Sequence, residues 1–272
     1  MSLTLGPGPL STQPEGGVNY LIDGPAHRIL FQPHPRRLRA LIDGQTVLDT
    51  TRGALLHESN IPPVLYVPLE DFDTSLLAPT GHTTHCPFKG DAFYWTLQVG
   101  DRVQENAVWG YPQALPEAAW LAPYAALPMD GADLWLEEDE EVLGHLRDPY
   151  HRVDARATSR RVDVLAGGEP IATSERAVMV FETGLPPRAY LPREDLADGL
   201  LTPGQTTTIC PYKGVASFFA VAAGEGALAD AAWSYPQPLG GVVTIADLVS
   251  FDHDEIETRV AEPERAFVAP AV

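Results

Sequence analysis

Residues 86–90 read Cys-Pro-Phe-Lys-Gly, and residues 210–214 read Cys-Pro-Tyr-Lys-Gly, 124 positions further along the chain. The same offset relates two more pairs of segments: Trp109-Gly-Tyr-Pro-Gln to Trp233-Ser-Tyr-Pro-Gln, and His27-Arg28 to His151-Arg152. Solenoids repeat every 20–50 residues or so, and this period is far longer. The sequence therefore predicts an internal duplication, with two copies of one domain that carry two versions of one site.

The repeat divides the 272 residues into two domains of ordinary size. Composition shifts mark the boundaries, because Pro and Gly punctuate the start, acidic residues the middle, and Pro and Ala the end. We expect a lead-in over 1–24, a first domain over 25–138, a linker over 139–148, a second domain over 149–261 and a tail over 262–272. The two domains are expected to form an intramolecular pseudo-dimer.

The formal net charge is −19, from 37 acidic residues against 18 Lys and Arg. A field of this sign repels phosphate backbones, which disfavours nucleic-acid binding. No stretch approaches the roughly 18 apolar residues of a transmembrane helix, and no signal peptide is visible. The two cysteines occupy equivalent positions in separate domains, which is typical of reduced thiols in the cytosol. We expect a cytoplasmic protein that binds neither nucleic acid nor membrane.

The pattern within each copy is short, apolar and punctuated, which predicts a mainly β fold. Asp43-Gly44 separates two apolar runs and predicts a β-hairpin, because Asp-Gly suits the positive φ of a tight turn. Its counterpart turns at Gly167-Gly168. The predicted strands are 38–42, 46–48, 54–56, 64–67 after Pro62-Pro63, and 92–99 in the first copy, with 162–165, 170–171 and 216–222 in the second.

Helical signals are few. Pro68 to Phe72 and Pro192 to Leu196 each predict one helical turn, with Glu70-Asp71 and Glu194-Asp195 as its acidic start. Pro116 to Tyr124 predicts a second helix, whose partner is Val243 to Val249. The fold class is thus mainly β, with one or two short helices in each domain.

The Cys-Pro-aromatic-Lys-Gly segment has two interpretations. As a functional site, Lys89 or Lys213 holds an anionic or carbonyl group, and Cys86 or Cys210 acts as a nucleophile. As a structural element, Pro and Gly make a rigid turn in which Cys packs as a small apolar residue. We favour packing for the cysteines. For the lysines, which are seldom buried without a partner, we favour binding.

The Trp-x-Tyr-Pro-Gln segment is the second candidate. Trp109 and Tyr111 share one face of a strand, as do Trp233 and Tyr235, because side chains alternate with a period of two. Such a pair either forms the floor of a ligand pocket or fills a core, and the proline that follows places it near a rim. The sequence leaves these two alternatives open.

Further charged residues and histidines are shared by the two copies. Arg52 and Glu58 match Arg176 and Glu182, and their six-residue spacing puts them on one face of a continuous strand. The simplest interpretation is an Arg52–Glu58 salt bridge. His27 or His151 is a candidate general base, although nothing in the sequence pairs either with a thiol.

A metal or cofactor site is not expected. His82, His85 and Cys86 lie close together in the first copy, but the second copy has Thr206, Ile209 and Cys210 there. The sequence also lacks a Walker loop, a dinucleotide-binding glycine fingerprint and a Gly-x-Ser-x-Gly elbow.

Taken together, the motifs resemble the bacterial domain of unknown function 427 family. The second copy matches it best, with Glu182-Thr-Gly-Leu-Pro-Pro-Arg-Ala-Tyr-Leu-Pro-Arg-Glu-Asp followed by Cys210-Pro-Tyr-Lys-Gly-Val-Ala. The resemblance covers both copies nearly end to end, and the tandem arrangement is similar to that of actinobacterial members.

The resemblance implies a β-tent-like domain, in which two small antiparallel sheets meet at a steep angle. This architecture is similar to methionine sulfoxide reductase B and the thalidomide-binding domain of cereblon, which place ligands in a pocket between the sheets. The zinc-binding cysteines of those proteins are absent from this sequence. The family carries a nucleotidyltransferase label, but the chain shows no clear pair of metal-binding carboxylates beside a Gly-Ser turn.

The leading hypothesis is a small-molecule binding protein with one pocket per domain. The expected lining residues are Lys89, Trp109 and Tyr111 near Cys86 in the first domain, and Lys213, Trp233 and Tyr235 beside Cys210 and Tyr212 in the second. Two rivals remain. One is an enzyme, either a cysteine hydrolase or transferase or a nucleotide-handling activity, and the other is a structural or partner-binding pseudo-dimer without a small ligand.

Overall fold

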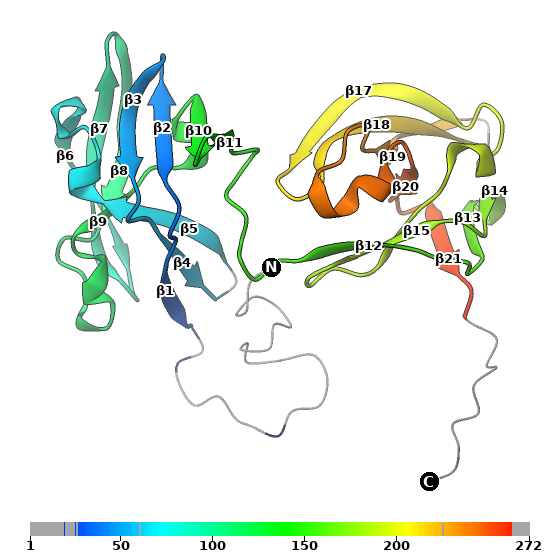
Figure 1. Ribbon diagram of the computed structural model, residues 1–272, viewed down its shortest axis with the longest axis horizontal. Coiled ribbons are helices and arrows are strands. Elements are labelled where there is room, and N and C mark those ends of the chain that lie inside the picture. Colours follow the sequence, from blue (N-terminus) through cyan, green and yellow to red (C-terminus); the bar gives the residue numbers. More distant parts are fainter. Residues whose placement is uncertain (1–18, 20–24, 26, 60, 225, 263–272) are drawn as a thin grey trace. The chain divides into compact units, whose positions relative to one another are not determined.

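The computed structural model describes residues 19, 25, 27–59, 61–224 and 226–262 (Figure 1). The chain divides into two compact units, Met1–Tyr150 and His151–Val272. The lead-in expected over 1–24, apart from Asn19, and the tail expected over 262–272, apart from Glu262, lie outside the described residues. The described part holds no helix of the length and hydrophobicity needed to cross a membrane.

The first domain is mainly β, as predicted, and its strands form two antiparallel sheets. The larger sheet has the order β1 (Ile29–Pro33), β4 (Ala54–Glu58), β5 (Ile61–Pro68), β9 (Tyr124–Ala126), β8 (Arg102–Gly110), β7 (Gly90–Val99) and β6 (Leu77–Cys86). The smaller sheet has the order β11 (Glu140–Glu141), β10 (Leu134–Glu137), β2 (Leu38–Ile42) and β3 (Gln45–Thr50). Strand β5 joins the two halves of the larger sheet because it pairs with both β4 and β9.

The second domain arranges the equivalent strands in three antiparallel sheets. One sheet is β12 (Val153–Ala157), β15 (Val178–Glu182) and β16 (Arg188–Tyr190), and another is β14 (Glu169–Ser174), β13 (Val162–Ala166) and β21 (Ile256–Val260). The third is β17 (Leu201–Cys210), β18 (Gly214–Ala223), β19 (Gly226–Ser234) and β20 (Val249–Phe251). In Figure 1 the long β17–β18 hairpin, drawn in yellow, arches over β19 and β20.

The short helices are 3₁₀ turns. Both predicted single turns are confirmed, as η1 (Leu69–Asp71) and η5 (Arg193–Asp195). The predicted second helix begins at Pro116 as η3 (Pro116–Leu121), and its partner η6 (Gly240–Ile245) begins three residues before the predicted start. The first domain adds η2 (Thr74–Leu76) and η4 (Met129–Gly131).

Local turn chemistry sets the hairpins. Asp43 and Gly44 both adopt positive φ, of 50° and 77°, which confirms the turn between β2 and β3.

The expected break at Pro62-Pro63 is wrong, because both prolines lie within β5. They are tolerated there because this end of β5 pairs only with β4, so its other edge needs no backbone donor. The region assigned to the linker contains β11, which pairs with β10.

Each domain buries two apolar clusters, and one of them is rich in aromatic residues. Along β5, Tyr66 belongs to the aromatic cluster and Val67 to the other, since neighbouring side chains in a strand point to opposite faces. In the second domain, Tyr190 likewise belongs to the aromatic cluster and Leu191 to the other. The aromatic cluster is where the two repeated motifs meet.

Candidate functional site

The Trp-x-Tyr motif places both aromatic side chains on one face, as predicted. Trp233, near the end of β19, is half-buried, and Tyr235 is 5% exposed in the same cluster. The Trp233 indole donates a hydrogen bond to the Tyr190 hydroxyl at 3.2 Å, and Trp109 does the same to Tyr66. Burial raises the pKa of Tyr190 to about 12, so this hydroxyl stays protonated near neutral pH.

The Cys-Pro-aromatic-Lys-Gly segment is the tight turn between two long strands. Cys210 ends β17 and pairs with Gly214, which begins β18 with a φ of 103°. A Cβ on Gly214 would lie 3.0 Å from the backbone oxygen of Gln237, so glycine allows the two motifs to approach closely. The Leu239 N–H also donates to the Lys213 carbonyl at 3.1 Å. This turn therefore fixes Lys213 next to the Trp-x-Tyr segment.

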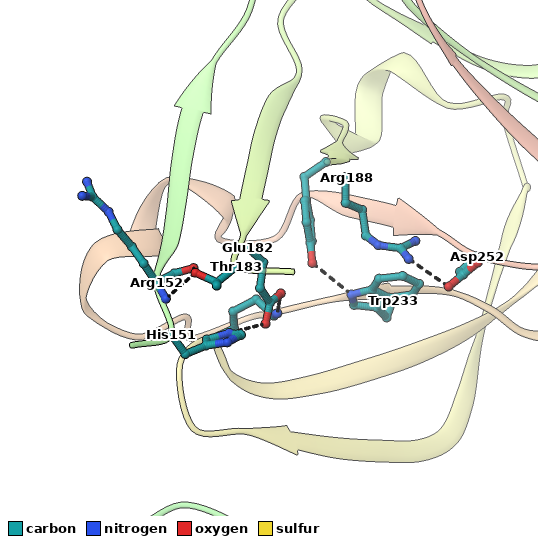
Figure 2. Close-up of polar contacts among 9 residues, drawn as sticks. His151, Arg152, Glu182, Thr183, Arg188, Trp233 and Asp252 are labelled. Atoms are coloured by element: carbon teal, nitrogen blue, oxygen red, sulfur yellow. Dashed lines mark hydrogen bonds and ion pairs between the residues drawn. The ribbon is translucent and has the colours of Figure 1, made fainter. Parts of the chain in front are cut away.

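A largely buried His–Glu–Lys network connects the end of β15 to the β17–β18 turn in the second domain. Lys213 donates a hydrogen bond to Glu182, and His151 Nε2 lies 3.0 Å from the other carboxylate oxygen (Figure 2). Burial opposes the charge of Glu182, but the hydrogen bonds from His151 and Lys213 outweigh it and lower the pKa of Glu182 to about 2. Glu182 is thus held as a carboxylate across the neutral pH range.

The first domain repeats this network. Lys89 donates to Glu58, and His27 Nε2 lies 3.2 Å from the second carboxylate oxygen. Lys89 is only 8% exposed, and its ammonium lies 5.4 Å from the centre of the Tyr111 ring. The expected Lys89 and Tyr111 are therefore neighbours, and Trp109 packs in the same aromatic cluster as Tyr111. The partner of Lys89 is Glu58, which sequence reasoning had paired with Arg52.

The predicted Arg52–Glu58 salt bridge is wrong. Arg52 instead binds Asp71, and its Nη1 lies 2.8 Å from Glu70. Arg176 likewise binds Asp195 at 2.7 Å. The prediction required a continuous strand from Arg52, but β4 begins only at Ala54, so Arg52 faces η1.

The second domain contains a pocket of about 400 Å³ beside the network. This volume lies within the range of small-molecule sites. Its aromatic lining is Phe218, Trp233, Tyr190 and Tyr235, and its charged lining is Glu182, Lys213, Arg188, Asp230 and Asp252. Three residues that the sequence singled out, Lys213, Trp233 and Tyr235, therefore border one cavity.

Arg188 and Asp252 are pocket residues that sequence reasoning missed. The Arg188 guanidinium donates to Asp252 and to the Phe251 carbonyl, each at 2.9 Å, and its Cζ lies 4.9 Å from the Trp233 ring centre (Figure 2). The positions 124 residues earlier are Val64 and Pro128. A comparison restricted to residues shared by the copies could not find this pair.

Tyr212 takes a different place from the one expected. Its ring packs against His151, with centroids 4.3 Å apart, and the described lining of the pocket does not include it. Phe88, its equivalent, stacks on His27 at 3.9 Å. The aromatic residue of the turn thus covers the histidine of the network in both domains.

A larger cavity, of about 670 Å³, lies in the first domain. Pro25, His27, Phe88 and Leu115 are among its lining residues. Its described lining does not include Lys89, Trp109 or Tyr111, so it is not the counterpart of the second-domain pocket.

The thiols and the first-copy histidines occupy separate environments. Cys86 and Cys210 are half-buried and pack against the aromatic clusters. His85 pairs with Asp91 at 2.7 Å, and the His82 ring packs against Tyr94. The described residues contain no group of three or more His, Cys, Asp or Glu side chains arranged to hold a metal ion.

The fold and site define a class of duplicated, mainly β protein with a buried His–Glu–Lys network in each domain. A family model described as a domain of unknown function (DUF427) matches residues 30–138 and 154–262, and the chain belongs to this family. No curated protein matches the chain.

Proposed function

We propose that the protein binds a small organic molecule in the second-domain pocket. The observation that carries this proposal is that Lys213, Trp233 and Tyr235 line one cavity of about 400 Å³. Ligand sites combine an apolar, partly aromatic surface with a few fixed polar groups, and this cavity has both.

The aromatic surface is pre-organised. Trp233 is oriented by its hydrogen bond to Tyr190, and Phe218 lies beside it with ring centroids 5.9 Å apart. The orientations of these side chains are fixed before a ligand arrives, which lowers the entropic cost of binding. A ligand with an aromatic ring fits this surface best.

The polar groups are also held in place. Lys213 is 11% exposed at its side chain and Glu182 is 13% exposed, and each satisfies the other's charge. An ammonium carries three donors, so Lys213 can bind Glu182 and still offer an N–H to the cavity. The network therefore acts as a fixed polar wall.

A pair of substitutions in β17 tests the proposal. Thr208 lines the pocket and is exposed, so Thr208→Phe fills the cavity from its rim. Thr207 is also exposed but points to the opposite face of the strand, so Thr207→Phe is the matched control.

The measurement is a ligand-observed NMR screen of aromatic fragments against the full chain. We expect fragments that bind the wild type and Thr207→Phe and are lost with Thr208→Phe. Fragments that bind all three proteins equally would place the site elsewhere and contradict the proposal.

A further inference from the structure

We propose that Arg188 selects an anionic ligand, so that the pocket takes a flat aromatic carboxylate in preference to its neutral or cationic analogue. This inference rests on the proposed function. It assigns the recognition of charge to a residue that only the second domain has.

Arg188 has donors to offer. A guanidinium presents five N–H donors in a planar fork that matches a carboxylate. Two of the bonds it makes go to Asp252 and to the Phe251 carbonyl. Its side chain is one-third exposed and lies over Trp233, where a ring packed in the pocket would bring its substituents.

The present partner of Arg188 is easily replaced. Asp252 is 67% exposed at its side chain, and an ion pair with such an exposed acid contributes little free energy. A ligand carboxylate inside the pocket would meet Arg188 in a less hydrated setting and compete well with Asp252.

Lys213 is not the residue that selects an anion. It can offer an N–H to the cavity, but its positive charge is already balanced by Glu182, which it binds. The three acids of the lining, Glu182, Asp230 and Asp252, also disfavour a doubly charged group such as a phosphate monoester. A single carboxylate directed at Arg188 fits both conditions.

The first domain provides the substitution for a test. Valine occupies the position of Arg188 there, as Val64, so this fold accepts valine at that point of β16. Arg188→Val removes the guanidinium, and Asp252→Asn removes only the competing charge. Arg176→Val, which breaks an Arg–Asp pair outside the pocket lining, is the control.

The experiment is calorimetric titration of the full chain with indole-3-acetate, indole-3-acetamide and tryptamine, which share one ring system and differ in charge. The wild type and Arg176→Val should bind indole-3-acetate about tenfold more tightly than the amide, as expected for a hydrogen bond to a charged group. Arg188→Val should lose this preference, and Asp252→Asn should bind indole-3-acetate more tightly than the wild type.

The outcomes separate this inference from the proposed function. If the three probes bind equally, if tryptamine binds best, or if Asp252→Asn weakens the binding of indole-3-acetate, the pocket is a ligand site but Arg188 does not select an anion. If no probe binds at millimolar concentration, this inference fails, and the fragment screen with Thr208→Phe and Thr207→Phe decides the proposed function separately.

Discussion

Lys213 binds Glu182 in the second domain as Lys89 binds Glu58 in the first, and each lysine lies 31 residues after its acid. Each acid also accepts from a histidine that lies 31 residues before it. One buried network therefore ties three distant segments together in both domains. The pocket, in contrast, uses Arg188 and Asp252, which the first domain replaces with Val64 and Pro128.

Glu182→Gln should destabilise the second domain by about 3 kcal/mol at pH 7, because it leaves Lys213 buried without an opposite charge. The folded pKa of Glu182, about 2, lies below its ordinary value of 4.5. Its contribution to stability is therefore present above about pH 4.5 and is lost as the pH falls toward 2. Urea unfolding at several pH values should show that the free energy of unfolding of the wild type approaches that of the variant over this pH range. A constant difference between the two proteins across this range would contradict the prediction.

His57→Phe should remove a pH dependence from the first domain. His57 is 1% exposed, burial lowers its pKa, and neither ring nitrogen has a hydrogen-bond partner among the described residues. The histidine of the unfolded chain binds a proton more readily than His57 does in the folded protein. Protonation therefore favours the unfolded state, and His57 lowers the free energy of unfolding more and more as the pH falls below 6.5. The second copy has Phe181 at this position. As the pH falls from 7.5 to 5, the urea midpoint of His57→Phe should rise relative to that of the wild type. Equal shifts of the urea midpoint in the two proteins would contradict this prediction.

Gly110→Ser should destabilise the first domain by about 1–3 kcal/mol, although serine is the native residue at the equivalent position. A Cβ on Gly110 would lie 2.7 Å from the Tyr124 carbonyl oxygen. Ser234, in contrast, is accommodated and accepts a hydrogen bond from Arg193 at 3.1 Å. Hydrogen exchange should show faster opening of β8 and β9 in the variant, and unchanged exchange would count against the described packing.

Short-range features of the fold could be predicted from sequence because a few neighbouring residues determine them. The turns at Asp43-Gly44 and Gly167-Gly168 both adopt the expected positive φ. The single helical turns after Pro68 and Pro192 are also found. The beginning of strand β5 could not be predicted from the sequence, because its pairing partners, and not its prolines, determine where it begins.

The site could be predicted only in part. Lys213, Trp233 and Tyr235 were found because both copies keep these residue types. The partner of Glu182 was missed because sheet register brings Lys213 to it from 31 residues away. The spacing of 31 between the shared histidine, glutamate and lysine was a usable signal. Arg188 left no such signal, because only one copy carries it.

Thiol reactivity distinguishes the binding protein from the rival cysteine enzyme. Cys86 and Cys210 are half-buried against aromatic clusters, and the histidine and lysine of each network bind a carboxylate. We expect both thiols to react slowly with iodoacetamide below pH 7 in the folded protein, and rapidly after denaturation at higher pH. Rapid alkylation of one thiol below pH 7 would favour the nucleophilic enzyme.

The most direct test of the proposed pocket is a titration of ¹⁵N-labelled full-length protein with indole-3-acetate, observed at the indole N–H resonances of its five tryptophans. Trp233 lines the pocket, and its N–H is fixed on Tyr190. The resonance that disappears in Trp233→Phe should shift saturably, Thr208→Phe should abolish that shift, and Thr207→Phe should preserve it. A stationary Trp233 resonance, or a shift that persists in Thr208→Phe, would contradict ligand binding in the second-domain pocket.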